Sequence, residues 1–122
     1  MEFVMSRRIE GLFSSLVPEE KASIISYGVA LRLSDLRKRL SLAESKVRLF
    51  EEKHHTSLEE LDTKGLPNDA GYEMHEDYIM WHHWADVVEE TRERIVSLEE
   101  IAEQGLYVGE VLRAGHRPTV AG

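Results

Sequence analysis

The amino-acid sequence predicts an all-α fold in which two long helices form an antiparallel, coiled-coil-like hairpin. Three observations support this fold class: only three of the 122 residues are proline, 31% are charged, and apolar residues recur at the three- and four-residue steps of a helix. A chain of this length predicts one domain. We place that helical domain at residues 1–104 and expect a flexible C-terminal tail at residues 105–122, where glycine is frequent and no period is visible.

The first predicted helix is short and covers residues 2–16. Its apolar residues are spaced four, three and four apart and therefore share one face: Met5, Ile9, Leu12 and Leu16. Val17 ends the helix because it precedes Pro18, and the residue before a proline is pushed out of the α region. This helix, or a second copy of the chain, is expected to cover the exposed side of the hairpin.

The second predicted helix is long and covers residues 18–54. Proline is tolerated in the first turn of a helix, so Pro18 is a suitable start. From Leu33 to Phe50 the apolar residues follow steps of three, four, three, four and three, which is a heptad-like seam. A helix of this length spans ~55 Å and is not stable alone in water, so it must pack along its length.

A short helix and a loop form the corner of the predicted hairpin. Ser57 precedes Glu60 by three residues, which is a capping box that opens a helix at residues 57–64. The loop L-P-N-D-A-G follows, and the last helix is predicted at residues 72–104, with Gly105 just past its end. Because the connection is short, the long helices are expected to run antiparallel and, with a second chain, to form a dimeric helical bundle.

Composition and motifs exclude several classes of function. The chain has no cysteine, so disulfides, thiolate metal sites and cysteine nucleophiles are all excluded. No apolar run approaches the ~18 residues that span a bilayer, and the N-terminus does not read as a secretory signal, so we expect a cytoplasmic protein. The sequence contains neither a G-x-S-x-G nucleophile motif nor a glycine-rich phosphate loop. We therefore predict a non-enzymatic protein without a cofactor.

The net charge of −8 is distributed unevenly along the chain. Residues 1–55 carry ten basic side chains against eight acidic ones, whereas residues 56–122 carry five against fifteen. Such an acidic half repels nucleic acid and attracts a basic protein. It also suits packing against the basic first half.

The stretch Tyr72–Glu90 contains both tryptophans and six carboxylates. A two-helix hairpin has too little apolar surface to bury all the aromatic and apolar residues of this stretch, and Trp and Tyr are favoured interface anchors. Trp81 lies on the helical seam and is assigned to the core. We predict that the stretch binds a protein partner through seven side chains: Tyr72, Glu73, Glu76, Asp77, Met80, Trp84 and Val87.

Two alternatives use the polar side chains of the same region. His82 and Asp86 are four residues apart on one helix and could share a metal ion with His54 or His55 across the hairpin. Clustered carboxylates could instead bind Mg²⁺, although such a site needs acids from at least two helices. Both patterns are more typical of a solvated helix face. A self-assembling helical scaffold is the remaining alternative.

The span from Phe50 to Ile95 carries a resemblance to known proteins. It contains F-E-E-K-H-H-T-S-L-E-E-L, then G-L-P-N-D-A-G-Y-E, then H-E-D-Y-I-M-W-H-H-W, after a long helix rich in Leu and Arg. This order resembles small prokaryotic antitoxin-like helical proteins encoded in toxin–antitoxin type gene pairs. The resemblance implies a binding protein whose acidic helix engages a basic, toxin-like partner. It carries over no active residue, and no DNA-binding half is visible.

Overall fold

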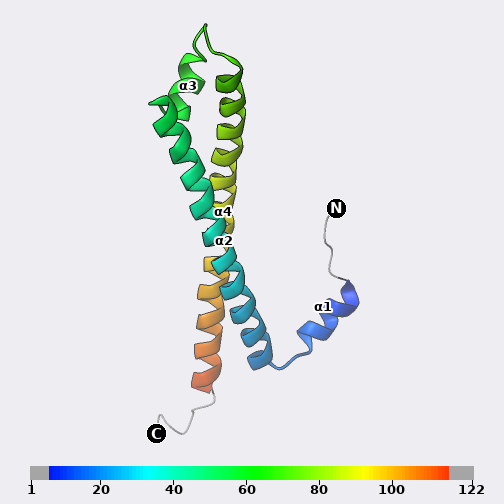
Figure 1. The fold of residues 1–122 in the computed structure, drawn as a ribbon. Helices are drawn as coiled ribbons and strands as arrows, with labels where there is room; N and C mark the ends of the chain where they lie inside the picture. Colours follow the sequence, from blue (N-terminus) through cyan, green and yellow to red (C-terminus); the bar gives the residue numbers. More distant parts are fainter. Residues whose placement is uncertain (1–5, 116–122) are drawn as a thin grey trace. The chain divides into compact units, whose positions relative to one another are not determined.

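A computed structural model of the 122-residue chain describes residues 6–115, and the side chains of residues 6–104. Every regular element in this part is a helix, and no strand occurs in it (Figure 1). The helices are α1 (Arg7–Ser14), α2 (Pro18–His54), α3 (Leu58–Lys64) and α4 (Tyr72–Gly115). The all-α prediction is therefore confirmed, and the main packing is that of the long helices α2 and α4.

The contacts within the chain divide it into two compact units. The first unit is Met1–Leu33 with Ser97–Gly122, and the second is Ser34–Val96. Helices α2 and α4 each contribute one segment to each unit, where the sequence led us to expect a single helical domain. The two units are described separately below.

In the second unit, α2 and α4 run in opposite directions. Lys53 pairs with Glu73 and Asp77, whereas Glu44, nine residues earlier on α2, pairs with Arg92 further along α4. The core of this unit contains side chains from α2, α3 and α4: Leu36, Ala43, Leu61, Trp81, Val87, Thr91 and Ile95. The heptad-like seam predicted for α2 contributes the first two, which are fully or almost fully buried.

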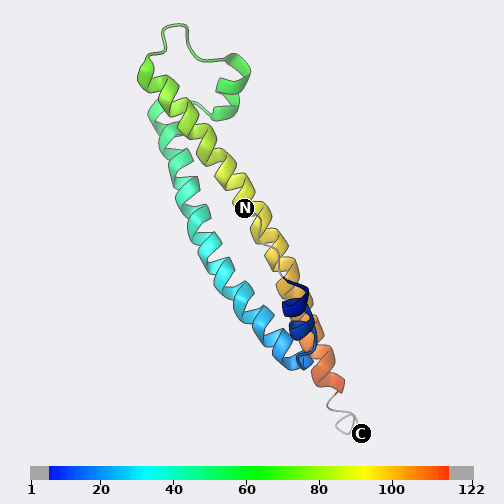
Figure 2. The same ribbon diagram turned by 90° about the vertical axis from the view of Figure 1, so that its right-hand side faces the viewer.

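The corner of the second unit is formed by local backbone geometry. His55 has a φ of 52°, so it enters the left-handed region just past the end of α2, which is a common way for a helix to stop. The Ser57 side chain accepts a hydrogen bond from the backbone N–H of Glu60 at 3.1 Å, as the predicted capping box requires. The Glu60 carboxylate accepts from the Thr56 hydroxyl. Gly65, with a φ of 81°, ends α3 (Figure 2).

In the first unit, Val29 and Leu33 of α2 are buried. Helix α1 begins after Ser6, whose side chain accepts from the backbone N–H of Ile9 at 3.2 Å. It ends at Ser14 rather than at the predicted residue 16, and the predicted start at residue 2 lies outside the described residues. The early end agrees with the local geometry, since the Ser15 and Leu16 N–H groups close tight turns onto Gly11 and Phe13.

Helix α4 continues beyond the predicted end at Gln104 and reaches Gly115. The prediction placed too much weight on Gly105 as a stop signal. One glycine within a helix costs only about 1 kcal/mol relative to alanine, which neighbouring helical residues offset. The backbone of residues 105–115 is thus helical where a tail was predicted, and residues 116–122 lie outside the described part.

Candidate interaction surface

One face of α4 in the second unit carries exposed apolar side chains next to acidic ones. The residues are spaced four, three, one and three apart, so they share a helical face, which we call the outer face of α4: Tyr72, Glu76, Ile79, Met80 and His83. Tyr72 is 80% exposed, Ile79 is 61% exposed and Met80 is 43% exposed. Large apolar side chains with this exposure, grouped on one face, are typical of a surface that binds another protein.

Trp81 lies in the core of the second unit, as its seam position predicts. Its side chain is fully buried and stacks on Phe50 and His54, with ring centroids 5.8 and 5.9 Å away. Trp84 is half-buried, and its ring makes an edge contact with His83 of the outer face at 5.2 Å. The two tryptophans therefore differ in role, and Trp84 lies at the border of the exposed surface.

Two of the seven predicted contact residues are engaged within the chain. Val87 is only 5% exposed, so the prediction that it faces a partner is wrong. The buried arc of α4 is wider than the seam and includes it. Asp77 accepts from Lys53 and His54 of α2 at 2.7 and 2.8 Å, and its side chain is 16% exposed. It joins α2 to α4 and is not available as a free acidic contact.

The environment of Asp77 favours its charged form. The hydrogen bond from Lys53 lowers the pKa of Asp77 below its ordinary value of 3.8, partial burial opposes this, and His54 adds to the lowering. The same contacts raise the pKa of Lys53, mainly through Asp77 and then through Glu73. Glu73 remains largely exposed while it pairs with Lys53 at 2.6 Å. This cluster closes the α2 end of the corner electrostatically.

A second polar cluster connects α3 to α4. Asp62 accepts hydrogen bonds from the Tyr78 hydroxyl at 2.6 Å and from His82 at 2.7 Å. The bond from Tyr78, followed by that from His82, lowers the pKa of Asp62, and the carboxylate raises the pKa of Tyr78. The Tyr78 and His82 rings also meet edge to face at 4.8 Å. Asp62 thus holds the short helix α3 against α4.

The four residues considered for a metal site do not come together. His82 pairs with Asp62, and His54 pairs with Asp77. His55 and Asp86 are exposed. Among the described residues, no three histidine or carboxylate side chains are arranged to hold a metal ion. The acidic side chains of Tyr72–Glu90 likewise form ion pairs or face outward rather than converging.

A hollow of about 560 Å³ lies at the corner, lined by residues of the α2 end, α3, the following loop and α4. The histidine in its wall, His54, is already paired with Asp77. The remaining wall is a mixture of loop backbone, Leu61, Leu66, Met74 and the polar side chains of α3. No nucleophile with an adjacent base is present in this wall.

Sequence reasoning missed two residues of this region. Ile79 contributes the second most exposed apolar side chain of the outer face, and its position seven residues after Tyr72 was a usable signal, since that spacing returns to the same face. Asp62 was missed because no local spacing relates it to Tyr78 and His82, which lie 16 and 20 residues away. Only the folded corner brings these three side chains together.

Compared with models of protein families, with curated proteins and with solved structures, the chain matches none of them. In the part of the chain that the structure describes, no helix combines the length and apolar character needed to cross a membrane.

Proposed function

We propose that this chain is a non-enzymatic protein–protein interaction module that binds a basic partner through the outer face of α4. The observation that carries this proposal is the exposure of Tyr72, Ile79 and Met80 on one helical face that also bears Glu76. Glu73, exposed at the rim, adds a second carboxylate. Apolar anchors surrounded by charge are the usual composition of a specific interface, in which the anchors supply affinity and the rim supplies partner choice.

The chemistry of this face defines the partner. Its three apolar side chains need a partner with a complementary apolar groove or helix stripe. Its carboxylates, together with the excess of acidic over basic residues in residues 56–122, favour lysine or arginine around that stripe. A small basic protein neutralised by this chain, as an antitoxin neutralises a toxin, fits this description. The resemblance of residues 50–95 to antitoxin-like proteins supports the same function.

The chain is further proposed to act as a cytoplasmic homodimer in which the α2–α4 pair forms a coiled-coil-like hairpin. The heptad-like seam from Leu33 to Phe50 supports the coiled-coil packing. Apolar side chains that stay exposed in the first unit, such as Tyr27 at 80% and Leu31 at 69%, support a second copy. The same exposure favours the alternative function, a self-assembling scaffold that captures no other protein.

The experiment compares surface variants with a matched control. Wild-type protein, Ile79→Ser, Met80→Ser and Val96→Ser are immobilised and exposed to an extract of the source cells. Val96 is also an exposed apolar residue of α4, at 54%, but it lies outside the outer face. We expect wild type and Val96→Ser to retain the same basic protein at equal stoichiometry. The two outer-face variants should retain at least about tenfold less, the effect of losing an interface anchor.

Binding of the purified partner then tests the electrostatic part. The affinity should fall as salt is raised, because Glu73 and Glu76 are exposed and their attraction to a basic partner is screened. Equal retention by Ile79→Ser, Met80→Ser and wild type would refute the outer face as the contact surface. A dimer that retains no protein at all would favour the scaffold. Metal bound stoichiometrically to untagged protein would favour the metal-binding alternative.

A further inference from the structure

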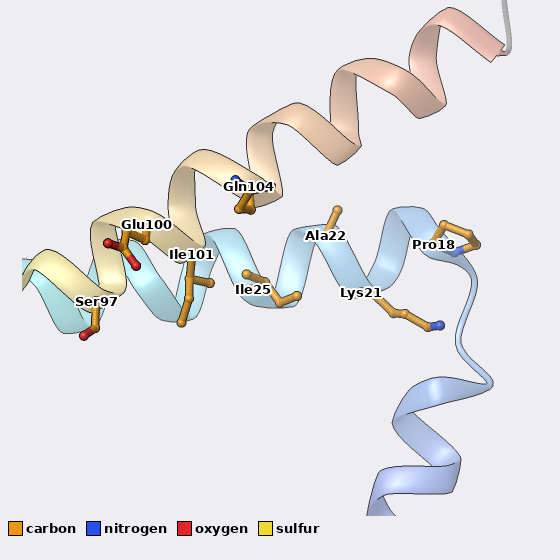
Figure 3. A pocket seen from close by; sticks show the side chains of 8 residues that line it. All are labelled: Pro18, Lys21, Ala22, Ile25, Ser97, Glu100, Ile101 and Gln104. Carbon is orange, nitrogen blue, oxygen red and sulfur yellow. The ribbon is translucent and has the colours of Figure 1, made fainter. Parts of the chain in front are cut away.

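The first unit contains an open apolar groove between α2 and α4. Its volume is about 590 Å³, and its walls are the start of α2 and the α4 segment 97–104: Pro18, Lys21, Ala22, Ile25, Ser97, Glu100, Ile101 and Gln104. Figure 3 shows the two helices separating toward the start of α2, with Ile25 and Ile101 at the narrow end. Ile101 is 46% exposed although it faces this groove. The packing of the two helices leaves these side chains only partly covered.

Helix α1 of the same unit has an apolar face without a partner. Ile9 is 53% exposed and Leu12 is 59% exposed, while Phe13, on the same face, is half-buried. No residue of α1 is buried, and none lines the groove as described. A helix of eight residues is too short to be stable in water by itself, so its formation depends on packing against another surface.

The groove and the apolar face of α1 match in length and in charge. Each groove wall and the α1 stretch from Ile9 to Leu16 cover seven residue steps, about 10.5 Å for helical residues. The wall segments 18–25 and 97–104 carry five glutamates and one lysine. Helix α1 carries Arg7 and Arg8 against one acid, Glu10. A basic amphipathic helix is therefore a fitting occupant for this acidic-rimmed groove.

The connection between α1 and α2 indicates which α1 occupies the groove. The Val17 carbonyl accepts hydrogen bonds from the N–H groups of Glu20 and Lys21, and the Ser15 N–H donates to Gly11. These bonds order the connection in the conformation that leaves the groove of the same chain open. Folding back onto that groove would require them to break. An α1 from another chain can enter without this change.

We propose that α1 of one copy occupies the groove of a second copy, and that the exchange is reciprocal in a two-fold dimer. Both apolar surfaces of both chains are then buried, and the contact closes on itself rather than continuing into a fibre. This inference rests on the homodimer proposed above and names its contact surface. It leaves the outer face of α4, in the other unit, available for the basic partner.

Cross-linking tests the exchange directly, because the chain has no cysteine of its own. Leu12→Cys and Ala22→Cys are made as separate proteins, mixed at equal amounts, left to exchange subunits and oxidised. We expect a disulfide between the two substituted positions on different chains, identified by peptide mapping. Ser14→Cys, on the opposite face of α1, replaces Leu12→Cys in the control mixture and should give little of this product.

Light scattering across a concentration series measures the dimer itself. Leu12→Glu should raise the dimer dissociation constant by at least about 100-fold, because a symmetric dimer loses two buried leucines. Ser14→Glu adds the same charge on the opposite face of α1 and should leave the constant unchanged. Far-UV circular dichroism confirms that both variants keep their helices. This is expected, since Leu12 is exposed within its own chain.

The outcomes separate the two proposals. A wild-type dimer that gives no interchain product and tolerates Leu12→Glu would overturn the exchange but leave the homodimer standing. A wild type that stays monomeric would overturn both. An intrachain disulfide in the double variant Leu12→Cys/Ala22→Cys, without interchain product in the mixture, would show that α1 closes its own groove and would also overturn the exchange.

Discussion

Replacement of Trp81 by alanine should strongly destabilise the second unit. The Trp81 side chain is fully buried and stacks between Phe50 and His54 of α2. Truncation of a buried tryptophan leaves a cavity that the two rings cannot fill by small shifts, and such changes typically cost about 3–5 kcal/mol. A domain of this size has a total stability of roughly 5–15 kcal/mol. The loss is therefore a large share of the free energy of unfolding.

A comparison with phenylalanine separates the packing of the ring from its polar atom. The indole Nε1 of Trp81 is buried and has no hydrogen-bond partner among the described residues. A buried, unsatisfied donor costs about 1–3 kcal/mol. Trp81→Phe removes this penalty while it keeps an aromatic ring between Phe50 and His54. We expect its free energy of unfolding to lie within about 1 kcal/mol of wild type.

Urea unfolding followed by far-UV circular dichroism measures these differences by linear extrapolation. The protein concentration is kept constant, because the stability of a dimer depends on it. Ile79→Ala, two residues away on the same helix but exposed, is the matched control and should change stability by less than about 0.5 kcal/mol. A Trp81→Ala effect below about 1 kcal/mol, or one no larger than that of the control, would refute the assignment of Trp81 to the core.

Two further predictions concern the corner. Because the folded state lowers the pKa of Asp77, its contribution to stability is complete above the unfolded-state pKa near 3.8 and is lost as pH falls through the lower folded-state pKa. An acid titration should thus destabilise wild type more steeply below about pH 4 than Asp77→Asn, and parallel curves would contradict this. Ser57→Ala should lower the free energy of unfolding by about 1 kcal/mol, since it removes the side-chain cap on the Glu60 N–H. Exposed Ser23→Ala, within α2, is the control, and an equal effect of both changes would argue against capping.

Where a helix begins or ends was predictable when the signal lies in local covalent geometry. The start of α2 at Pro18 follows from the restricted backbone of proline and of Val17 before it. The start of α3 follows from the serine at its cap. Gly105 is the opposite case, because glycine permits a helix to stop without requiring it to do so, and α4 passes through it.

The burial of single side chains was only partly predictable. Leu36, Ala43 and Trp81 lie on their predicted seams and are buried, because the centre of an apolar stripe faces the neighbouring helix at any reasonable rotation. Val87 lies at the flank of its stripe. Whether a flank is covered depends on how far α4 rotates about its axis against α2, and spacing along one helix contains no information on that rotation.

The sequence by itself determined the all-α class, the course of α2 and the capped corner, since these depend on backbone restrictions and on the helical period. The tertiary structure decided which side chains pair across the corner, namely Asp77 with Lys53 and His54, and Asp62 with Tyr78 and His82. It also decided which apolar residues stay exposed for other molecules on α1, α4 and the groove. These features depend on distances between segments far apart in the chain, which arise only when the helices pack.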